Sequence, residues 1–109
     1  EYLKMKTFNV TEQNRTEAIE AIANDIRQLE NLYELVDDEI DEICDPVEIG
    51  VCKFNPSRVL KELDPIAYEM WVDDYIEQRS VDTYYDLVYG DVKEVNIFDY
   101  NFIAEKVSD

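Results

Sequence analysis

Hydrophobic residues recur at intervals of three and four positions through the first half of the chain. This spacing places them on one side of an α-helix. The seam consists of Ile19, Ile22, Ile26, Leu29, Tyr33, Val36, Ile40 and Ile43. Asn14 is placed to cap the N-terminus, and Pro46 disfavours a helical conformation at Asp45. The pattern therefore predicts one long amphipathic helix from Asn14 to Asp45.

Three stretches outside this helix have the composition of β-strands. Residues 2–10 and 92–98 alternate hydrophobic and polar positions, with Leu3 and Met5 on the inward side of the first stretch. Residues 47–54 combine β-branched side chains with a central glycine. That combination predicts a bent strand or a tight hairpin.

Helix starts are marked by an Asn-Pro pair at 55–56 and an Asp-Pro pair at 64–65, each with a capping residue before the proline. The second of these helices should run to about Arg79, with a further short helix at 81–89 and a last helical turn or two within 99–107. All 109 residues are expected to form one α+β domain, with one long helix and several short ones packed with a small antiparallel sheet. An all-helical bundle is the alternative.

The chain is strongly acidic, since 27 Asp and Glu against 10 Lys and Arg give a formal net charge of −17. No Lys or Arg occurs between residues 28 and 52. In this region Glu34, Asp38, Asp41 and Asp45 repeat the step of the seam, which predicts a carboxylate stripe along its flank. Like charges at such spacings destabilise a helix by about 0.2–0.5 kcal/mol per pair. A local conflict of this kind is typical of a functional surface.

Motifs for catalysis and metal binding are weak. The chain has no His, and no nucleophile motif surrounds a Ser or Cys, so we expect no enzyme activity. Asp37, Glu39, Asp41 and Glu48 match positions 1, 3, 5 and 12 of a calcium-binding EF-hand loop, but Glu42 replaces the required glycine. We therefore expect no metal site and no cofactor.

Two cysteines, Cys44 and Cys52, match no zinc motif, and their number favours reduced thiols. No signal peptide and no apolar run of membrane-spanning length is apparent. We expect a protein of the cytoplasm that does not bind membranes. Met5 is a candidate native start, with 1–4 preceding it as a non-native leader.

A series of short motifs lies in residues 47–78. They are V-x-I-G from Val47, F-x-P-S-x-V-L from Phe54, D-P-I-A-Y from Asp64 and D-Y at Asp74. This block covers about a third of the chain and resembles one found in small phage and prophage proteins. Those proteins are mostly without an assigned function. The resemblance therefore implies a phage setting and a fold unit, but no activity.

Tyrosines alternate with acids towards the C-terminal part of the chain, notably at Tyr84, Tyr85 and Tyr89. Two interpretations are open. The rings pack in the core with their hydroxyls reaching water, or they form aromatic anchors of a contact surface with a charged rim. Direct binding of nucleic acid is not expected, because no basic groove is available for phosphates.

Charge and resemblance together favour a phage inhibitor that imitates DNA. A rigid helix with carboxylates every ~5 Å approximates a line of phosphates. We expect it to bind a basic, nucleic-acid-binding host protein, such as a restriction or CRISPR nuclease, and to block its groove. The alternative is an acidic interaction or structural module of a phage, including a homodimer through the seam. The residues expected to contact the partner are Glu34, Asp37, Asp38, Asp41, Glu42, Asp45, Asp73, Asp74, Glu77, Tyr84, Tyr85 and Asp86.

Overall fold

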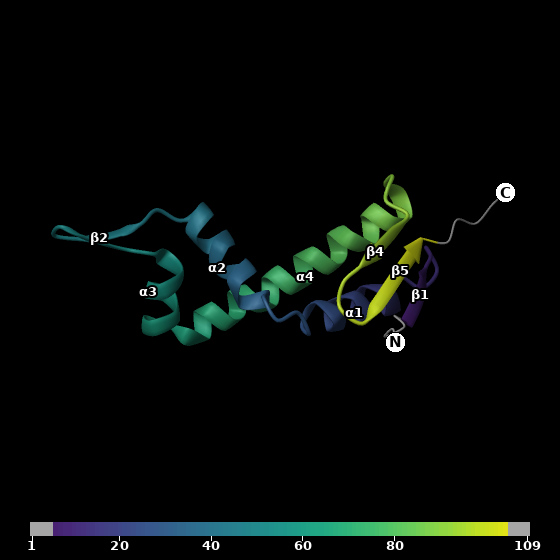
Figure 1. The fold of residues 1–109 in the computed structure, drawn as a ribbon, viewed down its shortest axis with the longest axis horizontal. Helices are drawn as coiled ribbons and strands as arrows, with labels where there is room; N and C mark the ends of the chain where they lie inside the picture. Colours follow the sequence, from purple (N-terminus) through teal and green to yellow (C-terminus); the bar gives the residue numbers. More distant parts are fainter. Residues whose placement is uncertain (1–5, 105–109) are drawn as a thin grey trace, which may run out of the picture. The chain divides into compact units, whose positions relative to one another are not determined.

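The computed structural model describes residues 6–104 of the chain (Figure 1). These residues divide into two compact units. The sheet unit comprises the described residues up to Leu29 and from Ile76 onwards, and the acidic unit comprises Glu30–Tyr75. Helix α4 (Pro65–Tyr89) begins in the acidic unit and ends in the sheet unit. A single domain over residues 1–109 stays a prediction.

The sheet unit contains a three-stranded mixed sheet. Its strands are β1 (Lys6–Val10), β4 (Glu94–Asn96) and β5 (Tyr100–Ala104). The central strand β5 pairs in parallel with β1 and antiparallel with β4. The strand predicted at 2–10 is present from Lys6 onwards, whereas Leu3 and Met5 lie outside the described residues. The helical turn predicted within 99–107 is wrong where the structure describes it, because this segment pairs with both neighbouring strands.

Helix α1 (Arg15–Ile26) and the last part of α4 supply the helical side chains of the sheet unit's core. In α1, Ala18, Ile22 and Ile26 are buried. The other buried hydrophobic residues of the unit are Val10, Ile76, Tyr84, Leu87 and Phe102. The first part of the hydrophobic seam is therefore taken up by the core of the unit.

The long helix predicted from Asn14 to Asp45 is wrong, because the chain forms α1 and a separate helix α2 (Leu32–Ile43). At the end of α1 the backbone N–H groups of Gln28 and Leu29 donate to carbonyls three residues earlier, both at 3.1 Å. Such bonds tighten the last turn of a helix and end it. The interruption contains neither Gly nor Pro, so the hydrophobic spacing continues across it without a visible signal.

The acidic unit contains α2, a two-stranded antiparallel hairpin and two further helical segments. The hairpin strands are β2 (Val47–Ile49) and β3 (Cys52–Phe54), and helix α3 (Pro56–Leu63) precedes the start of α4. Gly50 adopts a φ of 63° in the hairpin turn, a conformation that L side chains rarely adopt. Of the two alternatives predicted for residues 47–54, a bent strand or a tight hairpin, the hairpin is therefore the correct one. The buried hydrophobic residues are Leu32, Val36, Ile40, Tyr68, Val72 and Tyr75.

The helix starts predicted at the two Asx-Pro pairs are confirmed, because α3 begins at Pro56 and α4 at Pro65. The stop predicted near Arg79 is wrong, since α4 continues through Ser80 as one helix of 25 residues. Ser80 is buried, and its hydroxyl donates to the carbonyl of Glu77 within the helix. The four helices and two small sheets of residues 6–104 confirm the α+β class, with a mixed sheet in place of a purely antiparallel one.

Candidate functional site

Negative charge is concentrated in the acidic unit. Residues 30–75 contain 14 acidic and three basic side chains, a net charge of −11. The described residues of the sheet unit contain ten acidic and five basic side chains, a net charge of −5. The acidic unit therefore carries most of the negative charge. Some of its carboxylates bind other groups of the protein, and others face solvent.

Asp37 holds the fold together. One carboxylate oxygen accepts a hydrogen bond from the Tyr68 hydroxyl at 2.7 Å, and the other forms an ion pair with Lys61 Nζ at 2.9 Å. The same ammonium group lies 5.1 Å from the centre of the Tyr68 ring. These contacts connect α2 to α3 and to the start of α4. Asp37 is therefore engaged within the protein, contrary to its expected role in partner contact.

Asp41 caps a neighbouring helix. Its carboxylate accepts hydrogen bonds from the backbone N–H of Ser57 at 2.9 Å and from the Ser57 hydroxyl at 3.1 Å. Ser57 lies in the first turn of α3, where backbone N–H groups have no partner within the helix and a negative charge is favourable. Asp41 is therefore also engaged in the fold. Glu39 also has a partner within the protein, because its carboxylate accepts a hydrogen bond from Trp71 Nε1 at 3.0 Å.

The remaining acids of α2 form an exposed row. Glu34, Asp38 and Glu42 are exposed and lie four residues apart, so that each step rises about 6 Å along the helix. Asp45 is exposed just beyond the end of α2. The ion pairs of Lys6, Arg58 and Lys61 are made with other acids, namely Asp99, Glu62 and Asp37. The predicted stripe is therefore corrected: Glu42 belongs to the exposed row, and Asp41 does not.

The residues of α4 that were expected to contact a partner lie in different units and differ in exposure. Asp73 and Asp74 are exposed in the acidic unit, and Glu77 and Asp86 are exposed in the sheet unit. The expectation that Tyr84 contacts a partner is wrong, because this residue is 1% exposed and its hydroxyl donates to the Thr11 carbonyl at 2.9 Å.

Tyr85 is the more accessible of the two adjacent tyrosines. It is partly exposed, and its hydroxyl accepts a hydrogen bond from the Arg15 guanidinium at 3.0 Å. Its ring stacks on that of Tyr89. Core packing is therefore confirmed for Tyr84, and a role of Tyr85 in a contact surface stays a prediction.

The hydroxyl of Tyr68 provides a pH-dependent test of the α2–α4 contact. Burial, and then the hydrogen bond to the Asp37 carboxylate, raise the pKa of Tyr68 well above its usual range. An unfolded tyrosine loses its proton near pH 10, whereas the folded protein retains this one. The unfolded state then binds fewer protons, so the contribution of Tyr68 to stability is complete below about pH 10 and falls as the pH rises further.

We expect the variant Tyr68→Phe to lose part of this dependence. Chemical unfolding at neutral pH and above pH 10, together with the ultraviolet absorbance of tyrosinate, measures the effect. The wild type should lose more stability than the variant over this interval, and equal losses would contradict the assignment.

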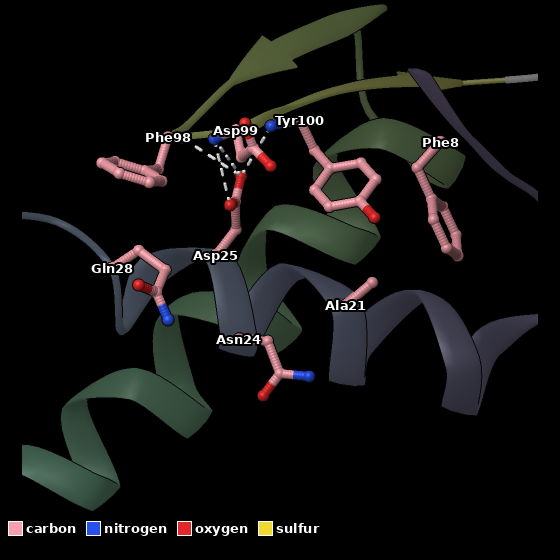
Figure 2. Close-up of a pocket in the computed structure, with 8 residues that line it drawn as sticks. All are labelled: Phe8, Ala21, Asn24, Asp25, Gln28, Phe98, Asp99 and Tyr100. Carbon is pink, nitrogen blue, oxygen red and sulfur yellow. Dashed lines mark hydrogen bonds between the residues drawn. The ribbon is translucent and has the colours of Figure 1, made fainter. Parts of the chain in front are cut away.

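The structure also has a pocket of about 390 Å3 in the sheet unit (Figure 2). It is lined by Phe8 of β1, by side chains of α1 and of Gln28 just after it, and by residues 98–100 at the start of β5. Asp25 projects from α1 towards that segment and accepts hydrogen bonds from the backbone N–H groups of Phe98, Asp99 and Tyr100 at 3.0–3.2 Å. As a residue, Asp25 is 3% exposed. Asp25 therefore anchors the β4–β5 connection to α1.

Sequence reasoning missed Asp25. A signal was present, since this acid precedes Ile26 and follows Ile22 by three positions, at the edge of the hydrophobic face. A carboxylate in such a position needs internal hydrogen-bond donors if it is to be buried. Its donors come from a segment more than 70 positions away, which spacing along the chain does not indicate.

Cys44 and Cys52 are free thiols in the structure, and Cys52 is exposed. Among residues 6–104, no group of three or more Cys, Asp or Glu side chains is arranged to hold a metal ion. Within the same residues, no helix has the length and hydrophobicity needed to cross a membrane. Comparisons with protein-family models, curated proteins and solved structures found no match to this chain.

Proposed function

We propose that this protein is a non-catalytic acidic inhibitor that occupies the nucleic-acid-binding surface of a basic partner protein. The observation that carries the proposal is the row of exposed carboxylates on α2, Glu34, Asp38 and Glu42, in a segment that contains no Lys or Arg from residue 28 to residue 52. A negative surface of this kind attracts Lys- and Arg-rich partners and repels nucleic acid. Its association with such a partner should slow as the salt concentration rises.

The spacing of the row limits what it imitates. Carboxylates about 6 Å apart on a straight helix are more widely spaced than the 3.4 Å rise per phosphate along one DNA strand. Because α2 has only 12 residues, the row imitates a short stretch of one strand. Asp45 extends the negative surface beyond the helix.

The identity of the partner class rests on the motif block in residues 47–78, which supports a phage setting. A phage protein that displaces nucleic acid has its natural targets among host nucleases that use DNA or a guide RNA. We therefore propose a restriction or CRISPR nuclease of the host cytoplasm as the partner. An acidic interaction module without inhibitory activity is the alternative.

Competition with labelled DNA for a purified restriction nuclease and a purified CRISPR effector tests the proposal. The protein should displace DNA from one of them, and the variant Glu34→Lys/Asp38→Lys/Glu42→Lys should need at least about a tenfold higher concentration, because three attractive contacts become repulsive. Asp41 is left unchanged, since its loss would uncap α3. The readout is DNA fluorescence anisotropy at two salt concentrations.

The matched control carries the same change of charge in the sheet unit, at three exposed acids: Glu17→Lys/Glu20→Lys/Glu94→Lys. This control should inhibit as the wild type does. If both triple variants lose inhibition equally, net charge and not the α2 row is responsible. Binding to the basic protein without displacement of DNA would favour the alternative of an interaction module.

A further inference from the structure

Three large hydrophobic side chains are exposed where α3 passes into α4. Leu63 is 80% exposed, Ile66 75% and Met70 62%. Leu63 is the last residue of α3, and Ile66 and Met70 lie one turn apart near the start of α4. We call these three residues the α3–α4 patch. Contiguous exposed hydrophobic residues bordered by polar groups are typical of binding surfaces.

The core of the acidic unit does not require this patch. The inward side of α4 is formed by Tyr68 and Val72, both of which are buried. Its first turn is capped by Asp64, whose carboxylate accepts from the backbone N–H of Ala67 at 3.1 Å. The start of α4 is therefore held in place by its inward side and its cap, while Ile66 and Met70 face outwards.

The chemistry of the patch is set by the acids beside it. Asp73 and Asp74 lie three and four residues after Met70, on the outward side of α4, and both are exposed. Neither is the ion-pair partner of Lys6, Arg58 or Lys61, which pair with other acids. The two basic residues of α3 are already engaged, since Arg58 pairs with Glu62 and Lys61 pairs with Asp37.

We propose that the α3–α4 patch and its two aspartates form a second binding surface, for a basic amphipathic helix of another protein. Ile66 and Met70, four residues apart on the outward side of α4, offer a hydrophobic strip against which the apolar face of a helix can pack, and Leu63 precedes it at the end of α3. Lys or Arg residues beside the hydrophobic face of that helix would meet Asp73 and Asp74. This inference goes beyond the proposed function, because it concerns residues other than the α2 row.

A second copy of the chain is a poorer occupant, because each acidic unit has a net charge of −11 and two such units repel each other. An anionic membrane is excluded for the same reason. An acidic or neutral helix would bury the patch but leave the aspartates without a counter-charge. Charge complementarity therefore selects a basic partner among those that could cover the hydrophobic residues.

A synthetic helical peptide with Leu on one face and Lys on the other is a suitable probe for the intact protein. The variant Ile66→Ser/Met70→Ser should raise the dissociation constant at least about tenfold, because it removes two hydrophobic side chains that the bound peptide would bury. The variant Asp73→Asn/Asp74→Asn should weaken binding and reduce its salt dependence. The matched control is Ile49→Ser/Val51→Ser, which removes two exposed hydrophobic residues of the hairpin and should leave the constant within about twofold.

A second measurement on the unaltered protein makes the test independent of variant folding. Methyl resonances of Leu63, Ile66 and Met70 should shift when the peptide is added. Equal binding of a peptide with Leu replaced by Ser would overturn the proposal, because charge alone would then explain the affinity. If the hairpin control weakened peptide binding as much as Ile66→Ser/Met70→Ser does, the proposal would also be overturned. The same holds if sedimentation showed a dimer of the protein that the Ile66→Ser/Met70→Ser variant abolishes, because a second copy would then cover the patch.

Discussion

Replacing Asp25 with Ala is expected to lower the free energy of unfolding by about 3 kcal/mol or more, since each buried group left without a hydrogen-bond partner costs about 1–3 kcal/mol. The backbone N–H groups of Phe98, Asp99 and Tyr100 would all lose their acceptor. A loss of this size should lower the melting temperature by more than about 10 °C. Thermal and chemical unfolding followed by circular dichroism measure it.

Two further variants distinguish the stability that the hydrogen bonds of Asp25 contribute from the effect of changing any acid on α1. Asp25→Asn keeps the shape but retains only one acceptor oxygen, so its stability should lie between those of the wild type and Asp25→Ala. Glu20→Ala changes an exposed acid of the same helix and should alter the free energy of unfolding by less than about 0.5 kcal/mol. Equal effects of Asp25→Ala and Glu20→Ala would show that the anchor contributes nothing beyond helix propensity.

Replacing Phe102 with Ala is expected to destabilise the protein by about 3–5 kcal/mol, the range found for large aromatic side chains removed from a core. Phe102 lies on the central strand β5, is 0% exposed and contacts the rings of Phe8 and Tyr100 at centroid distances of 5.7 Å. Side chains project from the faces of a sheet, so removing the ring leaves a cavity in the core beneath the central strand. Denaturant unfolding measures the loss.

Phe98 provides the matched control, because it precedes the same strand but is 49% exposed. Phe98→Ala should cost less than about 1.5 kcal/mol, since much of its ring already contacts water. Similar losses for the two variants would mean that β5 is not the centre of the sheet unit's core.

The local elements were predictable wherever short-range chemistry decides them. The helix starts at Pro56 and Pro65 follow from the fixed φ of proline, which suits the first helical position. Asp64 also caps α4, whereas Asn55 makes no side-chain cap and Asp41 caps α3 instead. The hairpin at 47–54 follows from β-branched residues around Gly50. Each of these signals acts within a few residues and does not depend on the rest of the molecule.

The two largest errors concern segments whose conformation depends on distant partners. Hydrophobic spacing continues through residues 27–31, but the chain leaves the helix there and starts α2 at Leu32. The segment Tyr100–Ala104 has no strong strand pattern, yet it becomes the central strand because β1, more than 90 positions earlier, pairs with it in register. Pairing over such distances is not encoded in local periodicity.

By itself, the sequence determined the α+β class, the acidic character and the amphipathic faces of α1 and α2, because composition and short-range spacing are sufficient for these. Only the tertiary structure decided which carboxylates are free. Asp37 and Asp41 are bound by Lys61, Tyr68 and Ser57, whereas Asp38, beside them in the chain, faces solvent. The physical reason is that successive residues on a helix point about 100° apart, so the packing of α3 and α4 against one side of α2 separates acids that the sequence places together.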